Sequence, residues 1–157
     1  MNPKNEYPKS FAMDVAELRR ALEQGGWRCT RQRAAVFDYL TSVDSHPSAE
    51  EVYAAVRQHV PKISLATVYK ALEALVDCHL ATKLTNSDGP TRYDSHCDPH
   101  YHFRCLQTGQ VHDLGVPYDP ELIDKLNPNL KQELLSHGFQ VTGYRLEILG
   151  EFAAADR

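Results

Sequence analysis

Histidine and aspartate side chains gather in one short window of the sequence, and one more histidine lies upstream. His100 and His102 form a His-x-His pair, and on a strand both would project from the same face because side chains alternate with period two. Imidazole and carboxylate together suit iron(II), manganese(II) or zinc(II) and do not form a soft thiolate site. The candidate ligands of such an imidazole–carboxylate metal site are His46, Asp94, His100, His102 and Asp113, although His46 could be a surface or capping residue and Asp94 could simply close a hairpin.

The chain before this window has the pattern of short helices followed by a hairpin. Apolar residues recur at helical spacing in four segments, which predicts helices over 13–24, 30–42, 48–60 and 64–76. The period then changes to two, and a turn over 86–90 separates two strand segments. This order is typical of a winged helix-turn-helix domain, in which the capped fourth helix is the recognition helix.

The second half has the pattern of a small α/β module. We expect strands over 101–106 and 110–114, a helix over 129–137 and a long strand over 139–152. A three-stranded sheet of this size is marginal alone, and a second copy would cover its edge. The predicted fold class is therefore α+β, with a winged helix-turn-helix DNA-binding domain over 1–92, a hinge to about 99, and a metal-sensing and dimerisation domain over 93–157.

Composition and charge are those of an ordinary globular protein. No apolar run approaches the ~18 residues of a membrane span, and the N-terminus lacks a secretory pattern. We therefore expect a cytoplasmic protein without a membrane partner. The chain is neutral up to Gly89, so its net charge of −4 comes from Pro90 onward. Arginines cluster over 19–33, and such a basic patch can neutralise DNA phosphates.

Three polar residues of the fourth expected helix lie away from its apolar stripe: Ser64, Thr67 and Lys70. Hydroxyls and a long cation near the start of a helix suit entry into the major groove, where they can reach base edges or phosphates. An ordinary solvated amphipathic helix has the same pattern. The chemistry of this helix alone leaves both interpretations open.

Several stretches of the sequence resemble the ferric uptake regulator (Fur) family. In order along nearly the whole chain, they are residues 26–33, 46–53, 63–70, 100–105, 109–113, 138–142 and 145–148. The resemblance implies a dimeric, metal-dependent transcription factor, usually a repressor, that binds a palindromic operator in double-stranded DNA. It also implies that Tyr69 contacts bases and that Arg28 lies near the DNA backbone or groove.

The ligand pattern resembles the peroxide-sensing (PerR) branch of that family. Asp94 precedes the first histidine of His-x-His by six residues, where iron-uptake regulators usually carry glutamate and zinc sensors often cysteine. The resemblance implies one regulatory site per subunit for iron(II) or manganese(II), with zinc(II) able to bind in vitro and one coordination position open. The hypothesis is that peroxide and iron(II) convert His46 or His100 to 2-oxo-histidine and release DNA.

The sequence departs from most relatives at its cysteines. Thr108 stands where a C-x-x-C pair beginning at Cys105 would end, and no cysteine follows, so we expect no structural four-cysteine zinc. Nearby alternative donors to the metal are His96, Cys97 and Asp98.

Two other functions stay open. One is an iron- or manganese-responsive repressor that does not sense peroxide. The other is a small metalloenzyme, such as a cupin-like oxygenase, although a jelly roll does not match the helical first half. We expect no enzyme activity and no small organic substrate.

Overall fold

The computed structural model describes residues 13–151. Four helices come first: α1 (Val15–Gln24), α2 (Arg31–Ser42), α3 (Ala49–Val56) and α4 (Leu65–Asp77). An antiparallel hairpin follows, formed by β1 (Thr82–Leu84) and β2 (Arg92–Asp94). We call residues 13–94 the helical part.

The remaining elements form the sheet part, residues 100–151. Its three strands have the order β4-β3-β5, with bounds β3 (Tyr101–Cys105), β4 (Val111–Leu114) and β5 (Glu147–Gly150). Strand β4 is antiparallel to β3, and β5 is parallel to it. Two short helices lie between β4 and β5 in the chain, α5 (Leu122–Leu126) and α6 (Leu130–Ser136).

Side-chain caps fix where the first four helices begin. Asp14 and Ser48 form capping boxes with the glutamates three residues later. Thr30 and Ser64 each accept a hydrogen bond from a backbone N–H of the first turn. These caps satisfy donors that the helix itself leaves free. The starts expected at Thr30, Ser48 and Ser64 are confirmed.

The main hydrophobic core lies among α1 to α4. Its most deeply buried side chains are Leu18, Leu22, Val36, Leu40, Val52, Val68, Leu72 and Leu75. Full burial of one such side chain stabilises a fold by about 1.5–3 kcal/mol. This core holds the four helices together and so positions the polar residues at their surface.

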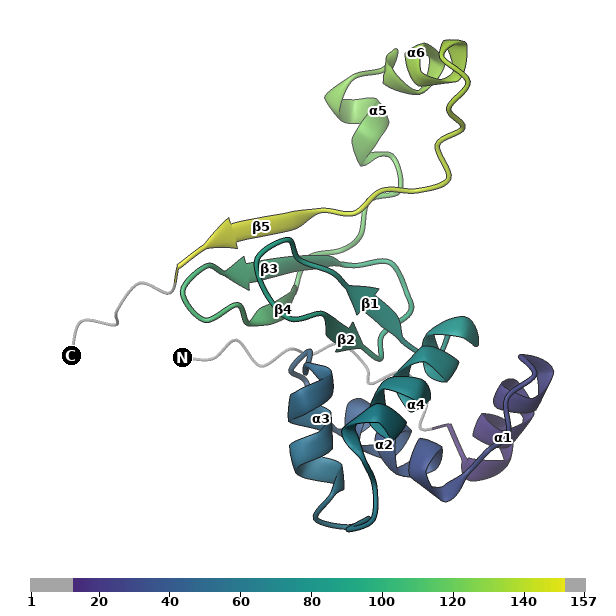
Figure 1. Ribbon diagram of the computed structural model, residues 1–157. Coiled ribbons are helices and arrows are strands. Elements are labelled where there is room, and N and C mark those ends of the chain that lie inside the picture. Colours follow the sequence, from purple (N-terminus) through teal and green to yellow (C-terminus); the bar gives the residue numbers. More distant parts are fainter. Residues whose placement is uncertain (1–12, 152–157) are drawn as a thin grey trace.

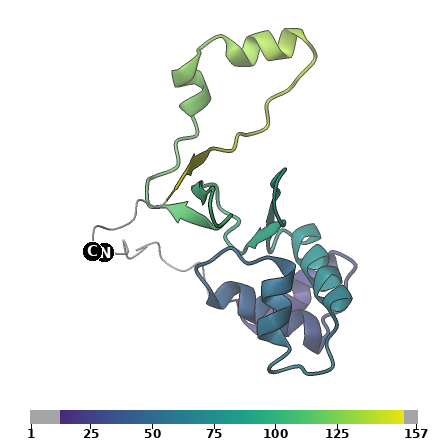
Figure 2. The same ribbon diagram turned by 60° about the vertical axis from the view of Figure 1, so that its left-hand side comes forward.

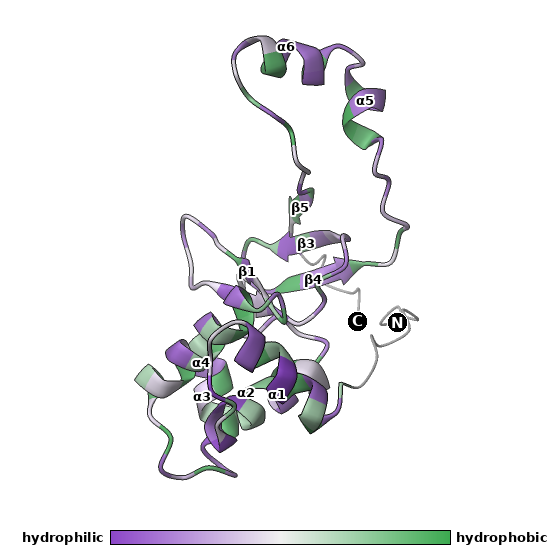
Figure 3. Ribbon diagram, turned by 90° about the vertical axis from the view of Figure 1, so that its right-hand side faces the viewer, coloured by the Kyte–Doolittle hydropathy of each residue, from purple (hydrophilic) through white to green (hydrophobic). Residues whose placement is uncertain are grey.

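The sheet part exposes much of its apolar surface. Figures 1 and 2 show α5 and α6 standing clear of both the three-stranded sheet and the helical part. Hydrophobic stretches on these two helices are green in Figure 3. The large exposed apolar side chains include Leu126, Leu135, Phe139, Ile148 and Leu149. Contiguous exposed apolar patches are typical of interaction surfaces.

The last strand is much shorter than predicted. We expected a strand over 139–152, but only Glu147–Gly150 pairs as β5, and Phe152 lies outside the described residues. A strand needs a neighbour for its backbone hydrogen bonds, and β3 offers one only opposite those four residues. The prediction was therefore wrong over 139–146.

Residues 95–99 have no regular structure and join the two parts. Strand β2 reaches Asp94, beyond residue 92 where we expected the first domain to end. The domain boundary, with its hinge to about 99, stays a prediction. Among the described residues, no helix has both the length and the apolar character needed to cross a membrane.

Candidate metal centre

The five predicted metal ligands lie together where the helical part meets the sheet part. His46 precedes the cap of α3, Asp94 ends β2, and His100 stands just before β3. His102 and Asp113 are direct partners across β3 and β4. Each side chain offers one donor atom, and these five atoms lie within 4.8 Å of one another.

Both carboxylates direct one oxygen towards the three imidazoles. Asp94 Oδ2 lies 3.1 to 3.5 Å from the Nε2 atoms of the histidines. Asp113 Oδ1 lies 2.8 to 3.5 Å from the same three atoms. The pairing of β3 with β4 and the loop before α3 thus bring the candidate ligand side chains into one small volume.

His46 has the surroundings of a metal ligand. It is 2% exposed, and its Nε2 atom has no hydrogen-bond partner among the described residues. That atom lies 2.8 Å from Asp113 Oδ1, but the contact lacks the angle of a hydrogen bond. A buried nitrogen without a well-aligned hydrogen bond is costly. A divalent cation would satisfy it and would also balance the charges of Asp94 and Asp113, so this donor set fits iron(II) or manganese(II).

Without a metal the cluster is a network of ion pairs. Burial lowers the pKa of His46, but contacts with Asp113 and Asp94 outweigh burial and raise it to about 9. The same carboxylates raise the pKa of His100 to about 10. Burial raises the pKa of each aspartate, yet the imidazoles hold both pKa values well below the usual range. His46 and His100 are therefore protonated at neutral pH.

Metal binding should release protons from these two histidines, because only a neutral imidazole can bind a metal. We expect the manganese(II) affinity to rise by up to about a hundredfold per pH unit between about pH 7 and pH 9. Calorimetric titration in buffers of different ionisation enthalpy counts the protons. Binding at pH 7 without proton release would contradict the ion-pair network.

The same groups give the metal-free protein a pH-dependent stability. The pKa of His46 and His100 is higher in the folded chain than the ordinary value of 6.5. Their stabilising effect is therefore complete below about pH 6.5 and is lost as the pH rises through 9 to 10. Metal binding and metal-free stability thus have opposite pH dependences.

The predicted DNA-contacting residues lie at the surface of the helical part. Arg28 is exposed, and so are Ser64 and Lys70. Ser64 caps α4, and its Oγ lies 2.8 Å from Thr67 Oγ1. The Tyr69 ring is 40% exposed, and its hydroxyl donates to an exposed carboxylate of α3 at 2.7 Å. Their contact with DNA stays a prediction.

The sequence analysis missed Arg92, which links the two parts beside the metal centre. Its buried guanidinium donates from Nε to the Gly109 carbonyl at 2.8 Å. Its Nη1 donates to the His46 carbonyl at 2.9 Å and to Glu51 Oε2 at 3.0 Å. No local pattern marks an arginine that will be buried in a strand, because its partners come from distant segments.

No cysteine is among the five converging donor atoms. Cys105 is buried, Cys97 is exposed, and none of the four cysteines forms a disulfide. Within residues 13–151, the histidine–aspartate cluster is the one group of metal-type donors. The expected absence of a four-cysteine zinc site stays a prediction.

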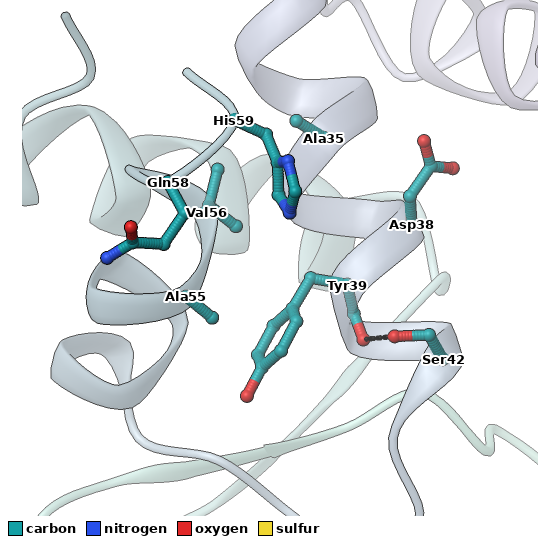
Figure 4. A pocket seen from close by; sticks show the side chains of 8 residues that line it. All are labelled: Ala35, Asp38, Tyr39, Ser42, Ala55, Val56, Gln58 and His59. Atoms are coloured by element: carbon teal, nitrogen blue, oxygen red, sulfur yellow. Dashed lines mark hydrogen bonds between the residues drawn. The ribbon is translucent and has the colours of Figure 1, made fainter. Parts of the chain in front are cut away.

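A separate pocket of about 620 Å³ lies between α2 and the end of α3, lined by side chains that include Tyr39, Val56 and His59 (Figure 4). None of the predicted metal or DNA residues lines it. The pocket is therefore not part of the metal centre.

Residues 24–149 match the profile of the ferric uptake regulator family. The chain belongs to this family. It is 35% identical over 142 residues to the peroxide-responsive repressor PerR of Staphylococcus aureus, covering 90% of this chain and 91% of that protein.

Two solved structures of the family are also similar to it. A zinc-bound manganese uptake regulator is 30% identical, with a TM-score of 0.63, covering 87% of this chain and 98% of that one. The Vibrio cholerae ferric uptake regulator is 26% identical, with a TM-score of 0.64, covering 85% and 98%.

Membership of the ferric uptake regulator family decides the class of protein. The chain is a metal-responsive transcriptional regulator and not an enzyme, so the metalloenzyme alternative is wrong. The predicted α+β fold class, a winged-helix DNA-binding domain followed by a dimerisation domain, is confirmed.

Proposed function

We propose that this protein is a repressor that holds operator DNA while iron(II) or manganese(II) is bound and releases it after peroxide oxidises a ligand histidine. The observation that carries the proposal is the convergence of three imidazoles and two aspartates within 4.8 Å. The similarity to a peroxide-responsive repressor over most of both chains supports it.

The proposed ligands come from both parts of the chain. His46 and Asp94 belong to the helical part, and the sheet part supplies His100, His102 and Asp113. A bound ion would therefore clamp one part to the other. In a homodimer, this clamp would fix the distance between two recognition helices, as a palindromic operator requires.

On the operator, α4 would enter the major groove. Tyr69 would contact bases, while the hydroxyls of Ser64 and Thr67 would reach base edges or phosphates. Lys70 and Arg28 would neutralise phosphates or line the groove. We propose that exposed apolar side chains of the sheet part, such as Phe139 and Leu149, hold the dimer without a four-cysteine zinc site.

Bound iron(II) would supply the chemistry that cleaves the oxygen–oxygen bond of peroxide. In the net reaction, one oxygen of hydrogen peroxide joins Cε1 of His46 or His100, and the other leaves as water. The imidazole loses two electrons, which the peroxide gains. The Cε1–H bond becomes a C=O bond, and the hydrogen moves to a ring nitrogen. That nitrogen then lacks the lone pair needed to bind metal, so the clamp is lost.

Peroxide should release the iron-loaded protein from its operator and leave the manganese-loaded protein bound. Mass spectrometry of the released protein should find one added oxygen atom on His46 or His100. Electrophoretic mobility with each metal, before and after peroxide, measures the release. Release of iron-loaded protein with both histidines unmodified would contradict this mechanism.

The second candidate is an iron- or manganese-responsive repressor that does not sense peroxide. The similarity to a manganese uptake regulator of 30% identity favours it. In that case peroxide would leave both metal forms on the operator, and only the metal concentration would control binding. The same experiment therefore separates the two candidates.

A further inference from the structure

His96 contacts the outer oxygen of both aspartates in the metal centre. Its backbone N–H donates to Asp94 Oδ1 at 2.7 Å, and its Nδ1 lies 3.6 Å from the same oxygen. The Nδ1 atom also lies 3.3 Å from Asp113 Oδ2. The other oxygen of each aspartate faces the three ligand histidines. Each aspartate thus presents one oxygen to the three ligand histidines and the other oxygen to His96.

His96 is held in place although it lies in the irregular segment 95–99. Its backbone hydrogen bond to the side chain two residues earlier has the form of an Asx turn. Its ring lies edge-on to the His100 ring, with centroids 6.0 Å apart, and its side chain is 30% exposed. The ring nitrogen of His96 is not among the five converging donor atoms.

Because His96 contacts one oxygen of each aspartate, this arrangement limits how many donor atoms a bound metal receives. A hydrogen bond or ion pair to the outer oxygen orients a carboxylate so that it binds a metal through its inner oxygen. Three imidazoles and two such aspartates provide five donor atoms. An ion that takes six ligands would therefore keep one position open. A small molecule such as water or peroxide can take that position.

We propose that His96 is a positioning residue that keeps Asp94 and Asp113 as one-oxygen ligands and so preserves the open coordination position. Without its side chain, Asp113 can turn its second oxygen towards the metal and close the site. The effect of His96 on the ligands can be tested with bound metal alone. Its link to peroxide rests on the proposed function.

Manganese(II) alone is the probe for this role. His96→Ala removes the ring, and His96→Gln keeps a donor that can reach Asp113. The matched control, Asp98→Asn, changes an exposed side chain in the same segment that is not among the five converging donors. Water-proton relaxation of the manganese-loaded protein measures water at the open position, and the manganese electron paramagnetic resonance spectrum measures ligand geometry.

We expect one manganese per subunit in the native protein and in all three variants. The relaxation enhancement should fall at least twofold in His96→Ala, with a changed resonance spectrum, and should recover in His96→Gln. Asp98→Asn should match the native protein. With iron, oxygen addition to the ligand histidines should be at least tenfold slower in His96→Ala.

Unchanged relaxation in His96→Ala would overturn the proposal. Loss of manganese from both His96 variants would also overturn it, because His96 would then be a ligand. If the native protein ignores peroxide, the proposed function fails, while the relaxation measurement still decides the role of His96.

Discussion

Replacing His46 with alanine should abolish the gain in operator affinity that metal provides. His46 is the ligand that precedes α3, so its loss leaves metal donors only on the hairpin and the sheet part. Metal should still bind, but more weakly, and it should no longer hold the core helices. We expect metal-dependent operator affinity to fall by about a hundredfold, within the usual range of about 5- to 150-fold for coupled sites.

Fluorescence anisotropy of labelled operator DNA, with excess manganese and with a chelator, measures this coupling. His59→Ala is the matched control, because His59 is an exposed histidine on the same part of the chain and lies outside the cluster. It should retain the full metal-dependent gain. A His46→Ala protein that keeps the full gain in affinity on adding manganese would show that the clamp does not act through His46.

Replacing Arg92 with methionine should destabilise the protein and also weaken its metal site. Methionine keeps the apolar stem but leaves the carbonyls of His46 and Gly109 without their donor. Glu51 is 52% exposed, so losing this ion pair matters less. We expect the free energy of unfolding to fall by about 2–4 kcal/mol. Manganese affinity should fall as well, because Arg92 holds the backbone of a ligand.

Urea unfolding of the metal-free protein and manganese titration together measure both effects. Arg104→Met is the matched control, because Arg104 is 4% exposed and pairs with Glu147 at 2.9 Å inside the sheet part. It should also lower stability, but it should leave manganese affinity close to native. Equal losses of manganese affinity in the two variants would mean that Arg92 has no special role at the site.

The sequence predicts the helical part well because its signals are local. The caps at Thr30, Ser48 and Ser64 act on backbone groups within one turn, so a short window contains all the information. Helix α5 was not predicted; it has only five residues, no side-chain cap and no buried side chain. The apolar pattern after Phe139 suggested a strand, but pairing depends on a partner elsewhere in the chain.

The convergence of the five candidate ligands could be predicted from the sequence, but the residues that support them could not. His102 and Asp113 are typical donors, and strand pairing brings them face to face. His96 has the same chemistry as the ligands, yet the turn after Asp94 directs its ring to the outer oxygens. Arg92 has partners distant in sequence, Gly109 on one side and His46 on the other. Such roles depend on orientation, which spacing alone does not contain.

The short segment 95–99 has a consequence for the speed of response. Five residues span at most roughly 18 Å even when fully extended, so the two groups of ligands cannot move far apart after the metal leaves. Each group meets the other at an effective concentration in the millimolar range. The ligands therefore come back together in an intramolecular step. An ion that binds again finds most of them already close to one another. Under the proposed function, losing the metal would change the orientation of the two parts while keeping them close together.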